Sequence, residues 1–239
     1  MTATVGRRLA AEFTGTGLLV AVVVGSGIAA TRLTTDAALR LLVNSLVTAM
    51  GLAVLILTFA PAGGAHFNPL VTAADWVLGR RTHHRYSLGE AAAVICAQVA
   101  GAIGGAALAD AMFGQAVLSP SRTGRTGPPL LLSEVVATAG LLLVIVTLSR
   151  TGRTKHAPWA VGAWIGAAYW FTASTSFANP AVTIGRTLTT TYAGIAPGSA
   201  PAFIAAQAVG ATFGTLLAVT IHPVTSAPAP ADTPAQLAG

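Results

Sequence analysis

Two Asn-Pro pairs are the residues whose type and spacing suggest a specific chemistry. Asn68 precedes Pro69, and Asn179 precedes Pro180. An asparagine at a helix start can cap that helix through its side-chain oxygen, while its amide N–H stays available as a donor. The residue before a proline avoids helical geometry, and proline suits the first turn of a new helix. Each pair therefore predicts a chain break, then a new helix with a hydrogen-bond donor at its tip.

Composition places these two tips inside a membrane. Only 8% of the residues are charged and 54% are hydrophobic, whereas an average soluble domain has about 25% charged residues. These values exclude a water-soluble enzyme and general disorder. The net charge is +6, but the basic residues lie in short runs between long apolar segments. That placement fits topology signals and not a nucleic-acid-binding surface.

Two apolar stretches are too long for one membrane span and too short for two. Residues 41–74 and 157–185 carry no charge, and each contains one Asn-Pro pair. Each stretch therefore predicts a full helix, a break and a short helix. The expected fold is an all-α membrane protein with spans at about 8–30, 39–61, 89–110, 131–149, 157–176 and 199–221, and short helices at 68–78 and 179–190. We expect residues 1–221 to form a single transmembrane channel domain and residues 222–239 to form a disordered tail.

The two halves of the chain are similar to each other, over about residues 7–112 and 128–221. Three matches carry the similarity, at offsets of 122, 111 and 109 residues: Glu12 with Glu134, Asn68 with Asn179, and Gln98 with Gln207. Each half holds three spans, and an odd number places the second copy upside down in the membrane. The two short helices then meet tip to tip near the midplane. Unwound backbone at that depth requires a polar path through the protein.

Lysine and arginine placement predicts that both termini are cytoplasmic. Eight basic residues then lie inside: Arg7, Arg8, Arg80, Arg81, Arg85, Arg150, Arg153 and Lys155. Five lie outside: Arg32, Arg40, Arg122, Arg125 and Arg186. The excess inside agrees with the usual bias of cytoplasmic loops.

Two Asn-Pro half-helices in an inverted repeat, with a glutamate in the first helix of each half, resemble the aquaporin (major intrinsic protein) family. The second motif, Asn179-Pro180-Ala181, keeps the family's Asn-Pro-Ala, whereas the first has Leu70 in place of the alanine. The stretches at 24–28 and 167–177 are most similar to bacterial aquaglyceroporins associated with arsenic resistance. Leu70 either narrows the lumen or packs away from it.

This resemblance implies a passive channel for water and small uncharged solutes. The solutes are glycerol-like polyols, with arsenite or related metalloid species as further candidates. The resemblance also implies a homotetramer with one pore per subunit, in the inner (plasma) membrane, without a cofactor or nucleic acid. The main alternative is an ion-coupled secondary transporter, because such proteins also use inverted repeats and broken helices.

The expected pore chemistry centres on Asn68 and Asn179. A water at the junction accepts hydrogen bonds from both, which orients it and interrupts a proton-conducting chain. The expected acceptors along the path are the backbone carbonyls of Gly64, Ala65, His66, Thr175, Ser176 and Phe177. His66 has no second ligand at metal spacing, so we expect a structural histidine and no metal site.

Glu12 and Glu134 lie inside predicted spans, where an acid is costly unless it is satisfied. Their symmetric positions favour a structural role, in which each accepts hydrogen bonds from the irregular backbone before a half-helix. The alternative role is proton coupling in a carrier. No nucleophile–base pair or metal cluster occurs in the spans, so we expect no enzyme.

By resemblance, the narrowest filter falls on Thr48, Ala167, Ser176 and Val182. A two-residue gap would replace Thr48 by Met50. The family usually has an arginine at the position of Val182, and the nearest arginine here is Arg186, one helical turn further on. The small side chains predict a wide, weakly polar constriction that passes solutes larger than water.

Overall fold

The structure, a computed structural model, describes residues 4–79 and 87–223. Most of the expected tail and the basic segment at 80–86 lie outside the described residues. The α-helices within them are α1 (Val5–Leu33), α2 (Ala37–Gly63), α3 (Pro69–Gly79), α4 (Leu88–Met112), α5 (Pro128–Arg150), α6 (Ala157–Phe171), α7 (Pro180–Arg186) and α8 (Ala200–Ile221). Short 3₁₀ turns, Thr154–His156 and Pro197–Ser199, precede α6 and α8. The all-α fold class is confirmed.

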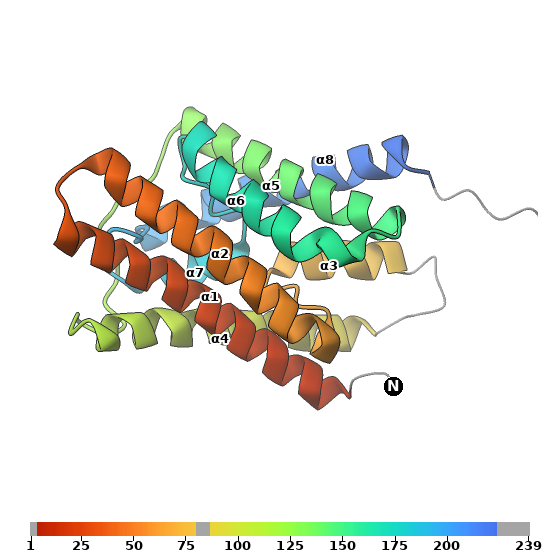
Figure 1. The fold of residues 1–239 in the computed structure, drawn as a ribbon, viewed down its shortest axis with the longest axis horizontal. Coiled ribbons are helices and arrows are strands. Elements are labelled where there is room, and N and C mark those ends of the chain that lie inside the picture. Colours follow the sequence, from red (N-terminus) through yellow and green to blue (C-terminus); the bar gives the residue numbers. More distant parts are fainter. Residues whose placement is uncertain (1–3, 80–86, 224–239) are drawn as a thin grey trace, which may run out of the picture.

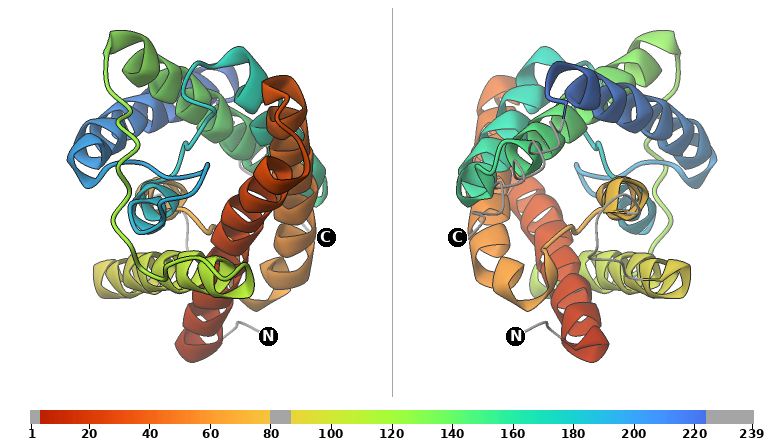
Figure 2. Two further views of the ribbon diagram at one scale, coloured as in Figure 1. Left: turned by 90° about the vertical axis from the view of Figure 1, so that its left-hand side faces the viewer. Right: turned by 90° about the vertical axis from the view of Figure 1, so that its right-hand side faces the viewer.

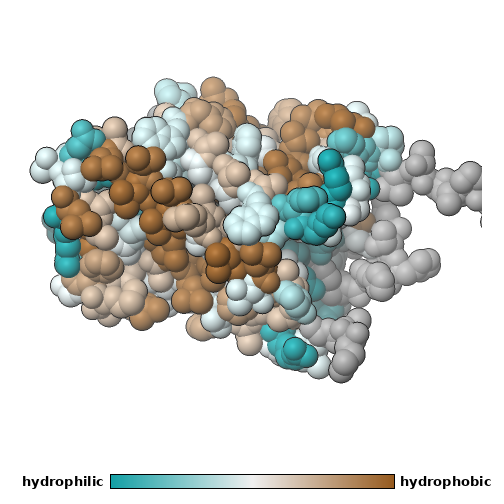
Figure 3. Space-filling model, in the orientation of Figure 1, coloured by the Kyte–Doolittle hydropathy of each residue, from teal (hydrophilic) through white to brown (hydrophobic). Residues whose placement is uncertain are grey.

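Membrane-length helices occur where the charge pattern predicts them. Among the described residues, α1, α2, α4, α5 and the segment containing α8 are long and apolar enough to cross a bilayer. The remaining expected span, at 157–176, corresponds to α6. This helix has only 15 residues, because the chain leaves it at Phe171 and turns toward the second Asn-Pro pair. Large apolar side chains on α2, such as Leu46, Met50 and Val54, are exposed, as expected for contact with lipid. Figure 3 shows apolar side chains across the middle of one face.

The two short helices lie end to end between the long ones. In Figure 1, α7 and α3 follow each other along the long axis of the molecule, and in the end-on views of Figure 2 they overlap. The helix α3 has nearly its expected bounds, whereas α7 ends at Arg186 and not at residue 190. It ends there because the amides of Thr187 and Leu188 close a tighter turn, bonding the carbonyls of Ile184 and Gly185 at 3.0 and 3.1 Å.

Close helix crossings in each half depend on glycine. A Cβ atom on Gly101 or Gly105 of α4 would overlap a backbone carbonyl oxygen of α1. A Cβ atom on Gly210 or Gly214 of α8 would overlap a carbonyl oxygen of α5 in the same way. Contact between backbones replaces the hydrophobic drive that lipid does not supply. The repeated glycine pairs therefore fix the packing against which each half-helix sits.

Candidate functional site

Each asparagine caps its own half-helix. The Oδ1 atom of Asn179 accepts hydrogen bonds from the amides of Ala181 and Val182 at 3.0 and 3.3 Å. The Oδ1 atom of Asn68 accepts one from the amide of Leu70 at 3.0 Å. The Leu70 side chain is partly buried and packs against the apolar core, and it does not line the pocket described below. The leucine thus leaves the cap intact and does not narrow this cavity.

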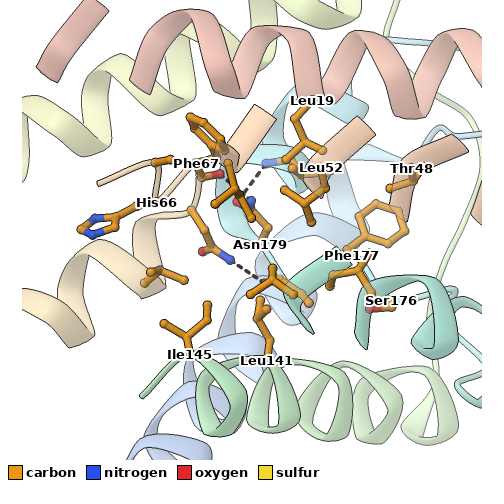
Figure 4. Close-up of a pocket in the computed structure, with 18 of the residues that line it drawn as sticks. Leu19, Thr48, Leu52, His66, Phe67, Leu141, Ile145, Ser176, Phe177 and Asn179 are labelled. Atoms are coloured by element: carbon orange, nitrogen blue, oxygen red, sulfur yellow. Dashed lines mark hydrogen bonds between the residues drawn. The ribbon is translucent and has the colours of Figure 1, made fainter. Parts of the chain in front are cut away.

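The same two asparagines also join the halves to each other. Asn68 Nδ2 donates to the carbonyl of Ala178 at 2.8 Å, and Asn179 Nδ2 donates to the carbonyl of Phe67 at 2.7 Å. Figure 4 shows Asn179 in the middle of the pocket with these bonds dashed. Each amide carries two hydrogens, so one remains for a solute. The half-helix tips therefore meet, as the inverted repeat predicts.

Buried glutamates hold the irregular backbone before each half-helix. Glu12 accepts hydrogen bonds from the amides of His66 and Phe67, both at 2.8 Å. Glu134 accepts them from the amides of Phe177 and Ala178, both at 2.9 Å. Both side chains are fully buried, and neither lines the pocket. This geometry supports the structural interpretation of the two acids.

Two glutamines complete these networks. Gln98 donates to Glu12 and to Thr72 Oγ1, both at 2.9 Å. Gln207 donates to Glu134 at 2.6 Å and to Thr183 Oγ1 at 2.9 Å. The sequence repeat contains both glutamines, but the repeat alone assigned them no role. Each glutamine is a polar residue at the same place in an apolar span of its half, and that pattern could have indicated a buried hydrogen-bonding role.

The backbone between each glutamate and its asparagine is strained in the same way in both halves. Ala65 and Phe67 have φ values of 50°, and Ser176 and Ala178 have 51° and 49°. These are left-handed conformations that side chains other than glycine rarely adopt. Strain of this kind persists only where the surroundings over-determine it. The carboxylate–amide bonds described above hold two of these residues directly, Phe67 and Ala178.

A narrow cavity of about 130 Å³ runs past both asparagines. Figure 4 places His66 at one end and Thr48 and Ser176 at the other. Among the expected carbonyl positions, Gly64, Ala65, His66, Ser176 and Phe177 line it, whereas Thr175 does not. A wider cavity of about 750 Å³ shares Gly64 and His66 with it and reaches Asp75 and Lys155. The two cavities therefore adjoin at these residues.

The expected filter is only partly assembled. Thr48, Ser176 and Val182 line the cavity; Met50, the alternative to Thr48, is 52% exposed on the outer face of α2. The prediction for Ala167 is wrong, because this residue is exposed and does not line the cavity. Successive residues of an α-helix are rotated by about 100° around its axis. Ile165 and Tyr169 therefore face inward, while Ala167 faces outward. Tyr169 lines the cavity in its place.

Arg186, to which the sequence analysis gave no role in the filter, also lies at the cavity. The charge count above includes it among the basic residues of the outside loops. In the structure its side chain is only 2% exposed and lines the cavity. Its Nε donates to the carbonyl of Ala193, and its guanidinium lies 3.4 Å from the centre of the Phe177 ring. The cavity wall therefore contains a guanidinium that the small side chains at the four expected filter positions did not predict. The missed signal is that Arg186 is the one charged residue between 157 and 231.

His66 lies where the two cavities meet. Its Nδ1 is 3.1 Å from Thr72 Oγ1, and its Nε2 is 3.8 Å from a carboxylate oxygen of Asp75. Within residues 4–79 and 87–223, no group of three or more histidine, cysteine or acidic side chains is placed to hold a metal ion. The arrangement is that of a hydrogen-bonded histidine in the channel wall.

Comparison with known proteins decides the family. The model of the major intrinsic protein family matches residues 1–176. The chain belongs to the major intrinsic protein family. It is 51% identical over 205 residues to the aquaglyceroporin AqpS of Rhizobium meliloti (strain 1021), covering 86% of this chain and 85% of that one. As a member of this family it is a multi-pass membrane channel and not an enzyme.

A solved structure shows the same fold. The aquaglyceroporin from Plasmodium falciparum superimposes with a TM-score of 0.69 and 21% sequence identity, covering 92% of this chain and 98% of that chain. At this identity the likeness concerns the arrangement of helices. The family fold, with two half-helices meeting inside it, is thus present in this chain.

Proposed function

We propose that this channel passively conducts water and small uncharged solutes of the glycerol class past Asn68 and Asn179. The observation that carries the proposal is the pair of crossed hydrogen bonds, 2.8 and 2.7 Å long, that join the half-helix tips inside a continuous cavity. Because one N–H of each asparagine is used in this junction, the other is available to orient a passing hydroxyl group or water.

The walls of the cavity suit a polyol. Most of the lining side chains are apolar, with Leu19, Leu52 and Val161 among them, while the asparagines and the hydroxyls of Thr48 and Tyr169 are polar. A polyol can turn its carbon chain to the first and its hydroxyls to the second. Arsenite in its uncharged trihydroxy form offers the same hydroxyl pattern. It is therefore a second candidate solute.

We further propose a homotetramer in the plasma membrane, with both termini on the cytoplasmic side. The beginning of α1 and the end of α8 lie at the same end of the molecule in Figure 1, which an even number of crossings requires. The basic side chains of Arg150 and Lys155 lie around the wide cavity at this end. That placement supports a cytoplasmic assignment for it.

Stopped-flow light scattering of proteoliposomes tests the function. Vesicles containing the protein, without any ion gradient, are mixed with hyperosmotic glycerol, urea or arsenite, and protein-free vesicles serve as the control. We expect water efflux and glycerol entry to be faster in the presence of the protein, at rates proportional to the solute gradient. Entry that requires a proton or sodium gradient would instead support the ion-coupled transporter.

A further inference from the structure

At one end of the narrow cavity, hydrogen-bond donors gather around a buried arginine that forms no ion pair within the described part of the chain. Arg186 is almost fully buried there. Within residues 4–79 and 87–223 its guanidinium has one hydrogen bond, from Nε to Ala193, and no carboxylate within ion-pair distance. A buried charge without a counterion is costly. Because only Nε is engaged in a hydrogen bond, the terminal amino groups remain available to a ligand.

Ser176 supplies an independent observation at the same end. Its side chain is 3% exposed and lines the cavity together with Arg186. Its hydroxyl has no hydrogen-bond partner in the described part of the chain. Buried hydroxyls normally find a partner, so this one is placed to bond a molecule in the cavity. Beside it, the hydroxyls of Thr48 and Tyr169 lie 3.3 Å apart.

A second arginine reinforces the positive charge. The guanidinium of Arg125 lies 5.1 Å from the centre of the Phe177 ring, the ring on which Arg186 also lies. Its Nε donates to the carbonyl of Gly194 at 3.0 Å. The nearby carboxylate of Glu134 is already bonded to two amides and to Gln207. Two positive charges thus flank one aromatic ring.

We propose that this end of the cavity binds a small, singly charged oxyanion, held by the guanidinium of Arg186 and the hydroxyl of Ser176. Guanidinium and hydroxyl donors are the groups that oxygen anions accept from. A cavity of about 130 Å³ admits only an anion of a few heavy atoms. The bound anion occupies the path of uncharged solutes and slows them. This second effect rests on the proposed channel function, whereas the binding does not.

Calorimetric titration of the purified full chain in detergent tests binding directly. The probe is sodium methanesulfonate, which carries one charge at all working pH values, and sodium chloride is the reference. We expect saturable binding to the wild-type protein, binding at least tenfold weaker in Arg186→Gln, and binding about tenfold weaker in Ser176→Ala. Arg122→Gln serves as the matched control and should bind like the wild type. It removes an exposed charge from the segment between α4 and α5, which also contains Arg125.

Glycerol entry into proteoliposomes tests the consequence. Methanesulfonate is present at equal concentration on both sides, so it creates no osmotic gradient. We expect it to slow glycerol entry in the wild type and in Arg122→Gln, and to leave Ser176→Ala largely uninhibited. Absence of saturable binding to the wild type, or equal binding by the wild type and Ser176→Ala, would overturn the proposal. If the wild type conducts no glycerol in chloride, the channel function fails, and the calorimetry still decides the anion site.

Discussion

Asn68 donates a hydrogen bond of 2.8 Å to the backbone carbonyl of Ala178, a residue of the opposite half of the chain. Asn179 repeats the relationship with Phe67. Each half-helix tip is thus held by the backbone of the other, while its own asparagine oxygen caps it. The junction therefore requires both halves of the chain in their final arrangement.

Replacing Asn179 separates capping from the contact between halves. In Asn179→Ser the hydroxyl can still cap α7, but it is too short to reach Phe67, whereas Asn179→Ala loses both interactions. Loss of a cap costs about 1 kcal/mol, so we expect the alanine variant to unfold at a lower temperature than the serine variant. Both should conduct water more slowly than the wild type. Thermal unfolding in detergent and stopped-flow measurement of the same preparations check this; unchanged water flux in both variants would contradict it.

Glu134→Gln distinguishes a structural acid from a coupling acid. The carboxylate accepts three hydrogen bonds from Phe177, Ala178 and Gln207, and an amide places a donor against one of them. Loss of such charge-assisted bonds in a buried site costs about 3 kcal/mol. We expect a marked fall in the unfolding temperature and in glycerol flux. Glu90→Gln serves as the control and should be neutral, because Glu90 lies at a helix start that glutamine also suits. A stable Glu134→Gln protein that loses only its response to a proton gradient would support the carrier.

Gly105 and Gly104 are adjacent but differ in what a side chain would meet. A Cβ on Gly105 would overlap the carbonyl oxygen of Gly17, whereas one on Gly104 meets nothing within 4 Å. We expect Gly105→Ala to force α1 and α4 apart and to lower the thermal unfolding temperature. Gly104→Ala should be neutral or stabilising by up to ~1 kcal/mol, because alanine favours a helix. Equal unfolding temperatures for the two variants would show that this crossing is loosely packed.

Val182→Arg tests the solute passage beside Arg186. Val182 lines the cavity, and a second guanidinium there takes space and adds a like charge. We expect glycerol and arsenite entry to fall at least tenfold. Ala167→Leu, on the exposed face of α6, should leave both fluxes within about a factor of two. If Ala167→Leu slowed both fluxes and Val182→Arg did not, the constriction would contain Ala167 and not Val182.

The helices and the symmetry between the two halves could be predicted from the amino-acid pattern alone. The charge-free stretches are long enough to mark the spans, because lipid tolerates so few charges. Each Asn-Pro pair marks a helix start, since proline geometry is local. Three matched pairs, with Glu12 and Glu134 among them, were enough to predict an inverted repeat and buried acids that serve the backbone. These features can be read from local residue patterns, from the length of a span, or from the recurrence of one pattern in the second half of the chain.

The set of side chains that line the cavity could not be predicted in the same way, because it depends on how the helices pack. Ala167 turns outward and Tyr169 inward because α6 packs on α2 through one face, and sequence alignment to a family cannot fix that rotation. Arg186 enters the cavity because α7 stops after seven residues and the following chain offers the carbonyl of Ala193 and the ring of Phe177. The direction of a long side chain is set by contacts between segments distant in sequence or folded back in a loop. Local residue patterns carry no record of those contacts.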